Sequence, residues 1–229
     1  MKRGNYLHRL IVLGAVLLLA GYGSAGADER QYSGFINDYS GLQETTDPEG
    51  DHFLRMVSPS LTPENYHALI IEKVQFYPQP KPSEKVSQST LDDIVAYLNT
   101  ELEARLAEKV QVTDKAGPGV ARLRIAVTGV GAKAEDLKPY QFIPIALVLT
   151  TAKRAATGTP EDAKLYVEAE VTDSVNGERL LVSVRKGTGE KLKKSVEGEQ
   201  VVTLDTVKPL IDEWLDGVTK EAHTFIKPL

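Results

Sequence analysis

Three glycines near the start of the chain have the spacing of a cofactor-binding loop. Gly21, Gly23 and Gly26 form G-x-G-x-x-G after an apolar run, a pattern typical of loops that hold the phosphates of a dinucleotide. Such a loop has to open a helix inside a strand–helix–strand unit. Residues 28–42 are instead polar, aromatic and glycine-bearing, with no apolar stripe at helical spacing. This context argues against a nucleotide site.

A second glycine pattern, GVGAKA, occupies residues 129–134. The strand before a dinucleotide loop is normally buried on both faces, but here it carries Arg122 and Arg124. Pro139 also interrupts the sequence before a helix could form. We therefore interpret these glycines as a strand exit, and we expect no cofactor.

The histidines and acidic residues do not form a recognisable metal motif. His52, His67 and His223 contain no pair at the i, i+4 spacing of a zinc protease helix. Residues 47, 49 and 51 alternate as acids, like the start of a calcium loop, but Pro48 and a missing distal glutamate break that pattern. We predict a solvated acidic turn and no metal.

The sequence also lacks the local signatures of an enzyme. It has no cysteine, which excludes thiolate catalysis and disulfides, and it contains neither a G-x-S-x-G elbow nor a Walker loop. A pair of carboxylates assembled only in three dimensions stays an alternative, as in a hydrolase. The formal charge of −5 argues against a nucleic-acid partner. We predict that the protein is not an enzyme.

Residues 1–27 have the layout of a secretory signal peptide. Basic residues precede an apolar stretch over residues 10–20, and Ala25 and Ala27 form an A-x-A cleavage site. The stretch is shorter than the roughly 20 residues that a transmembrane helix needs. Loss of three of the 27 basic residues leaves 24 against 32 acidic ones, a formal charge of −8. We predict cleavage after Ala27 and an exported protein, either periplasmic or loosely associated with the envelope.

The next segment, residues 28–66, is predicted to be an aromatic N-terminal arm with loop structure. Turn formers dominate it, and residues 45–51 read as a loop. Tyr32, Phe35 and Tyr39 are large rings that we expect to pin the arm to the body, and they are candidate docking residues.

Residues 67–229 are predicted to form one α+β domain. Apolar and β-branched residues predict a strand over residues 66–77, and clean alternation predicts another over residues 120–130. Asn176-Gly177 predicts a hairpin, in which Val167, Ala169 and Val171 would match Leu180, Val182 and Val184. The most apolar stretch after the signal, residues 142–152, is predicted to be buried in the core, and the alternative is a loop that touches a membrane or binds a partner.

Two amphipathic helices complete the predicted domain. One begins near Thr90 with Ser89 as its cap and ends near Lys109. The other spans residues 206–225, with Pro209 in its first turn. Half-polar strands and two helices predict an antiparallel or mixed sheet with both amphipathic helices packed on one face.

Three segments are similar to a known family. "YSGFINDYSGL" from Tyr32, "VSPS" from Val57 and "VEAEVTDSVNGERLL" from Val167 resemble DUF3313, uncharacterised proteins of the Gram-negative envelope. The resemblance implies lipoproteins and supplies no catalytic residues. A lipoprotein would hold a cysteine after "LLLAG", where this chain has Tyr22. A phenol cannot accept the lipid, which argues against membrane attachment by this route.

These observations predict an exported, non-enzymatic binding or interaction module of the bacterial envelope. Its partner would be an envelope protein or a small envelope ligand. One alternative is an accessory subunit of an envelope assembly or transport complex, docked through the aromatic arm. The other is a hydrolase with a site assembled only in three dimensions.

Overall fold

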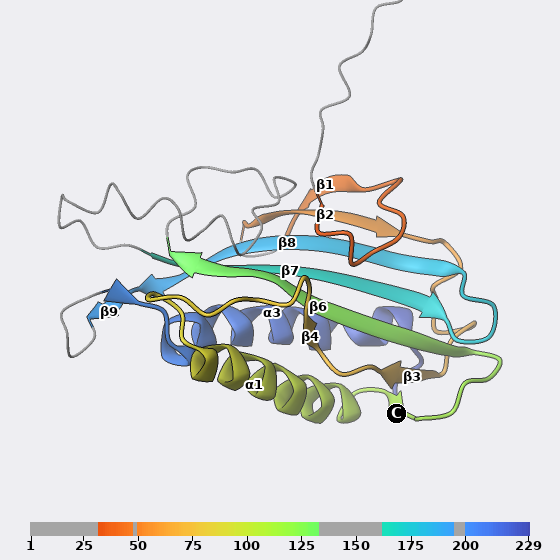
Figure 1. Cartoon of the computed structure of the whole chain (residues 1–229). Coiled ribbons are helices and arrows are strands. Elements are labelled where there is room, and N and C mark those ends of the chain that lie inside the picture. Colours follow the sequence, from red (N-terminus) through yellow and green to blue (C-terminus); the bar gives the residue numbers. More distant parts are fainter. Residues whose placement is uncertain (1–31, 48–49, 133–161, 195–199) are drawn as a thin grey trace, which may run out of the picture.

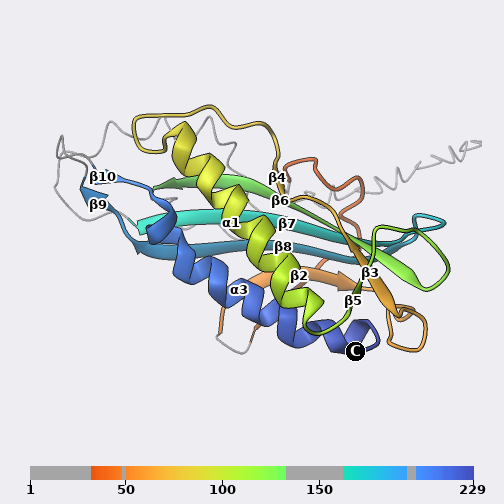
Figure 2. The same ribbon diagram turned by 90° about the horizontal axis from the view of Figure 1, so that it is seen from below.

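An eight-stranded mixed sheet forms the centre of the protein, with two helices on one face and the N-terminal arm on the other (Figure 1). The computed structural model describes residues 32–47, 50–132, 162–194 and 200–229. Helix α1 (Gln88–Ala107) and helix α3 (Leu204–Phe225) lie side by side beneath the sheet (Figure 2). This confirms the predicted α+β fold. Within these ranges no helix has an apolar stretch long enough to cross a membrane.

Long antiparallel strands make up most of the sheet, and three short parallel strands complete one side. The order is β1 (Gln43–Thr46), β2 (His52–Val57), β8 (Arg179–Lys191), β7 (Asp162–Asp173), β6 (Val120–Ala132), β3 (Ala68–Ile71) and β5 (Gln111–Val112), and β4 (Gln75–Phe76) also pairs with β6. Strands β9 (Lys193–Lys194) and β10 (Gln200–Val201) form a separate pair. Strands β3, β4 and β5 are the parallel ones.

The prediction of a single strand over residues 66–77 is wrong, because the chain forms the two strands β3 and β4 there. Between these two strands, Val74 does not take part in the backbone hydrogen bonds of the sheet. Its amide donates instead to the side-chain oxygen of Asn99 on α1, 2.9 Å away. The chain then rejoins β6 further along, with Phe76 opposite Val127. A contact with a helix distant in sequence therefore divides the strand.

Two strands also lie in the segment that was expected to be arm and loop. Strand β1 pairs with β2, and β2 pairs with β8, both antiparallel. Phe53 and Leu54 are buried next to each other in β2, so the strand buries both of its faces here and lacks the alternation by which a half-buried strand is recognised.

The starts of both helices differ from those predicted. The N-cap of α1 is Ser87, whose hydroxyl accepts from the amide of Thr90 at 3.1 Å, so Ser89 lies inside the helix. Helix α3 begins at Leu204, where the amide of Thr203 donates to the Thr206 hydroxyl at 3.0 Å. Pro209 consequently lies beyond the first turn, where its missing amide costs one helical hydrogen bond.

The predicted hairpin is confirmed, but its predicted register is wrong. Val171 lies opposite Leu181 and Ala169 opposite Ser183, and Leu180 falls at an irregularity where the register shifts. The loop is longer than a two-residue turn: the Asp173 amide donates to the carbonyl of Glu178. A register slip of one residue exchanges the faces of a strand. The observed register places Val182 and Val184 on the face of the sheet away from the helices.

Candidate functional site

An apolar cavity of about 150 Å³ lies between the sheet and the two helices. Its floor consists mainly of side chains from β2, β6, β7 and β8, and its walls come mainly from α1 and α3, with Leu61, Leu69 and Ile226 completing the lining. The helix residues that line it are aliphatic or aromatic with one exception, Glu221, as follows: Leu98, Leu102, Leu106, Ile211, Trp214, Leu215, Val218, Glu221, Ala222 and Phe225. The space is therefore apolar along most of its lining, and Arg55, Ser183, Arg185 and Glu221 are its polar or charged residues.

The cavity exists because the helices do not seal the middle of the sheet. Ile125, Val167, Ala169 and Leu181 face the helices from central strands, yet each remains partly exposed. Side chains at such positions are normally close-packed and dry. On the opposite face of the same strands, Glu168 is only 1% exposed. On these central strands, the aliphatic side chains that face the helices are therefore more accessible to water than Glu168 on the opposite face.

One cross-strand row leads from the apolar interior to a charge. Ile125 lies opposite Ala169, Ala169 opposite Ser183, and Ser183 opposite Arg55, and all four line the cavity. Neighbouring strands are about 4.8 Å apart, so the row spans roughly 14 Å. The small side chains of Ala169 and Ser183 leave the space in the middle. Polarity rises steadily toward the edge of the sheet.

Arg185 and Asp47 form a closed ion pair at the border of the cavity. The Arg185 guanidinium lies 3.0 Å from Asp47 Oδ2 and 3.6 Å from the centroid of the Phe53 ring. The Asp47 side chain is only 8% exposed, and its other oxygen accepts from the amide of Asp51 at 2.8 Å. This pair is held on both sides and stabilises the turn between β1 and β2.

Arg55 and Glu221 form a more open pair that joins the sheet to α3. Their side chains approach to 3.0 Å, and that of Glu221 is 45% exposed, whereas that of Arg55 is 19% exposed. The guanidinium also lies over the ring of Phe225, 5.2 Å from its centroid. Arg55 therefore presents a partly desolvated positive charge at the cavity, and its carboxylate partner extends into water.

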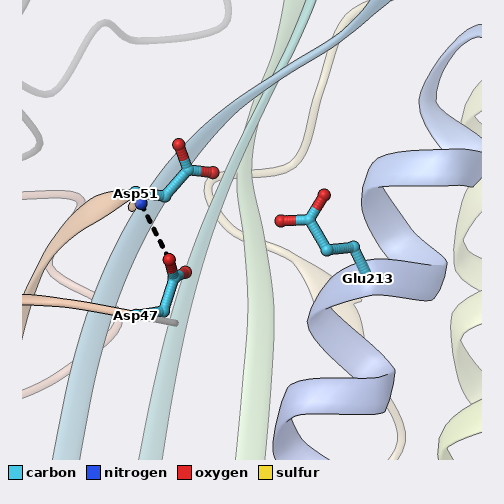
Figure 3. A group of neighbouring side chains, drawn as sticks. All are labelled: Asp47, Asp51 and Glu213. Carbon is cyan, nitrogen blue, oxygen red and sulfur yellow. Dashed lines mark hydrogen bonds between the residues drawn. The ribbon is translucent and has the colours of Figure 1, made fainter. Parts of the chain in front are cut away.

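Three carboxylates, those of Asp47, Asp51 and Glu213, lie close together next to the Arg185–Asp47 ion pair (Figure 3). One oxygen of each lies within 4.8 Å of the others, and Glu213 points from α3 toward the turn that carries the two aspartates. Asp47, however, already binds Arg185 and the backbone of Asp51. His52, His67 and His223 are exposed, and none of them belongs to this group. The arrangement is an acidic rim, and we assign no metal to it.

The arm on the other face is fastened to a buried carboxylate, Glu168. Its oxygens accept from the Ser33 amide at 3.1 Å, the Ser33 hydroxyl at 2.7 Å and the Tyr39 hydroxyl at 2.6 Å. The Tyr39 oxygen in turn accepts from the amides of Gly34 and Ile36, both at 3.1 Å. We call Ser33, Tyr39 and Glu168 the arm latch.

Burial shifts the titration of both ionisable groups in the arm latch. Desolvation raises the pKa of the Glu168 carboxyl above its ordinary value, and the hydrogen bonds from Tyr39 and Ser33 oppose that rise. Burial, followed by the bond to Glu168, raises the pKa of Tyr39 to about 12. The phenol therefore stays protonated and keeps donating at neutral pH.

The raised pKa of Glu168 predicts a pH dependence. A carboxyl whose pKa is raised on folding binds its proton more readily in the folded state, so stability rises as the pH falls through that pKa. Between about pH 7 and about pH 5, the wild type should gain free energy of unfolding relative to Glu168→Gln, measured by urea denaturation. All other carboxylates are common to both proteins. A constant difference between the two curves would contradict the prediction.

The candidate docking residues all lie against the chain's own sheet. Tyr32 stacks on Tyr39 with ring centroids 4.0 Å apart, and Phe35 is 4% exposed beneath Arg124, whose guanidinium carbon lies 4.7 Å from the ring centroid. The rings pin the arm as expected, and docking to another protein stays a prediction. Ala25, Ala27, Tyr22 and residues 142–152 lie outside the described residues.

The residues that shape the cavity carry no motif in the sequence. Ala169 and Ser183 are small residues in ordinary strands, and Arg55 lies in a segment interpreted as loop. Glu168 and Glu170 could have indicated the arm latch from the sequence. They occupy alternate positions of an otherwise apolar strand, and carboxylates on a face that becomes buried require hydrogen-bonding or charged partners.

Comparison with known proteins gives a family and two relatives. A family model described as "Protein of unknown function (DUF3313)" matches residues 31–218. The relatives, from Escherichia coli strains K12 and O157:H7, are both described as "Uncharacterized lipoprotein YdcL". Each is 33% identical over 211 residues, which is 92% of this chain and 94% of the relative.

Solved structures show weaker similarity. The hypothetical protein CT253 from Chlamydia trachomatis has a TM-score of 0.38 and 9% identity, over 67% of this chain and 96% of that one. Protein XCC0632 from Xanthomonas campestris has a TM-score of 0.33 and 12% identity, over 74% and 87% of the two chains. Likenesses of this size do not establish a shared activity.

Proposed function

This chain belongs to DUF3313, a family of proteins of unknown function, and we propose that it is a non-enzymatic binding module that holds an apolar ligand between its sheet and α3. Its relatives are uncharacterized lipoproteins, which associates the family with the cell envelope. Export to the periplasm is part of the proposal and rests on the predicted signal peptide.

One observation carries the binding role: aliphatic side chains at the centre of the sheet remain accessible through the cavity. A cavity with apolar walls gains little from water, because water needs two to four polar partners. A space of about 150 Å³ has room for about ten water-sized groups, and an apolar chain can fill it with favourable contacts. Concave apolar sites of this kind are typical ligand sites.

The accessory-subunit alternative is less favoured by the contacts of the arm. It requires Tyr32, Phe35 and Tyr39 to meet another protein, whereas Phe35 is buried and Tyr39 is bonded to Glu168. Docking through these rings would have to open the arm latch.

The lone tryptophan makes the proposal directly testable. Trp214 is the only tryptophan and lines the cavity, so a bound probe should change its fluorescence. We expect the uncharged probe N-phenyl-1-naphthylamine to bind with energy transfer from Trp214. Ala169→Phe should abolish most of the binding because the ring occupies the cavity.

A second variant and a control separate binding from folding. Val218→Phe enlarges a lining residue that is 38% exposed, so it has room and should also weaken binding. Ala96→Phe, on the exposed side of α1, should leave binding unchanged. Thermal unfolding checks that each variant is folded. Equal probe binding by the wild type, Ala169→Phe and Val218→Phe would rule out the cavity as the site.

A further inference from the structure

We propose that the ligand is a single-chain amphiphile with an anionic head group, whose acyl chain lies in the cavity and whose head group binds Arg55 in place of Glu221. This inference rests on the proposed function and adds the chemical class of the ligand. A fatty acid and a phosphate-bearing single-chain lipid share this chemistry.

The cross-strand row gives the ligand its two ends. The row begins at Ile125, passes the small residues Ala169 and Ser183, and ends at the guanidinium of Arg55. A ligand along these roughly 14 Å meets hydrocarbon first and a positive charge last. A purely apolar molecule would make use of the apolar end of the row alone and would leave Arg55 with Glu221, whereas an anionic amphiphile matches both ends.

Arg55 is the arginine that can exchange its partner. Asp47 is nearly buried and bonded on two sides, so its pairing with Arg185 is fixed. Glu221 faces Arg55 through one ion pair and is 45% exposed. Its carboxylate therefore loses little when it turns into water. A guanidinium has five N–H donors in a plane that suits carboxylate and phosphate groups.

The acidic rim does not reverse this preference. Glu213 lies eight residues before Glu221 on α3, about 12 Å along the helix, and Asp51 lies four residues before Arg55, about 13 Å along an extended chain. Both separations exceed the screening length of roughly 8 Å at physiological salt. Asp47 is neutralised by Arg185. Glu221 is thus the acidic group that competes with the ligand for Arg55, and its removal should favour an anion.

The test compares four probes with one alkyl chain: dodecanoate, dodecyl phosphate, dodecanol and dodecyltrimethylammonium. Binding is followed by Trp214 fluorescence and by calorimetry. We expect Arg55→Gln to weaken dodecanoate or dodecyl phosphate about tenfold and Glu221→Gln to strengthen the same probe. Dodecanol should be affected by neither change. The relative affinities of the two anions distinguish a carboxylate from a phosphate ligand.

The matched control is Arg122→Gln, which removes an arginine paired with Glu72 on the other side of β6. It should leave every affinity unchanged. Opposite effects of Arg55→Gln and Glu221→Gln cannot arise from a general loss of folding. If dodecanol binds as tightly as the anions and ignores both variants, or if the cation binds best, the head-group inference is wrong while the apolar site stands. If no probe binds, the proposed function itself fails.

Discussion

Alanine in place of Gly189 is expected to destabilise the protein by about 3 kcal/mol, the cost of forcing atoms into a packed contact. Gly189 lies on β8 where the first turn of α3 crosses it. A methyl group there would overlap the backbone carbonyl oxygen of Thr206 and would lie 3.3 Å from the Cα of Val207. Both atoms belong to the helix backbone, so no side-chain rotation relieves the overlap. Urea denaturation at neutral pH measures the loss.

The control for this substitution lies in the helix that makes the contact. Gly217 in α3 is exposed, and a methyl group there would meet nothing outside its own helix backbone within 4 Å. Gly217→Ala should therefore stabilise the protein by about 1 kcal/mol through helix propensity. A loss of stability in Gly217→Ala, or none in Gly189→Ala, would contradict the close approach of α3 to β8.

This contact also explains why the cavity lies where it does. Gly187 and Gly189 share the helix-facing side of β8, and a methyl group on Gly187 would come within 2.5 Å of Trp214. Helix α3 therefore rests almost directly on the strand at its N-terminal end. The residues of α3 that line the cavity begin at Ile211, beyond this crossing. Glycine is needed here for space, since neither residue has a positive φ.

Glu168→Leu is expected to release the arm while the sheet and helices stay folded. Each hydrogen bond to an ionised group contributes about 1.5–3 kcal/mol, and desolvation of the carboxylate offsets part of the total for three bonds. We expect a net loss of about 2–3 kcal/mol in the closing of the arm, which is a decrease of roughly a hundredfold in hydrogen-exchange protection. The decrease in hydrogen-exchange protection should be confined to the arm, residues 32–42.

The comparison for this variant is Glu72→Leu, because Glu72 pairs with Arg122 and its side chain is 42% exposed. It should change the protection of the arm little. Uniform loss of protection in Glu168→Leu would show that the latch supports the whole fold, and unchanged protection would show that the arm is held by its rings alone.

The arm illustrates which contacts could not be read from the chain. Its aromatic residues were recognisable, and their burial against the body follows from their size. The polar partner of the arm could not be recognised in the same way, because Glu168 lies 129 residues from Tyr39. The segments that carry the family resemblance, around Tyr39 and Glu168, meet in this bond.

Short-range patterns in the sequence were sufficient for most of the local elements and for their general arrangement. Helical spacing of Leu91, Ile94 and Leu98, alternation in β6 and the Asn176-Gly177 loop together predicted an α+β fold with both helices on one face. Such patterns repeat within a few residues, so they can be recognised without knowledge of the rest of the chain.

The tertiary structure alone decided which face of each strand lies against the helices, and therefore which residues line the cavity. The register of β7 against β8 sets Ala169 beside Ser183, and the pairing of β2 with β8 adds Arg55 to the same row. A shift of one residue would exchange the two faces, turning Glu168 toward the helices and Ala169 toward the arm. Cavities form where elements distant in sequence fail to meet, and no periodicity within one element encodes that gap.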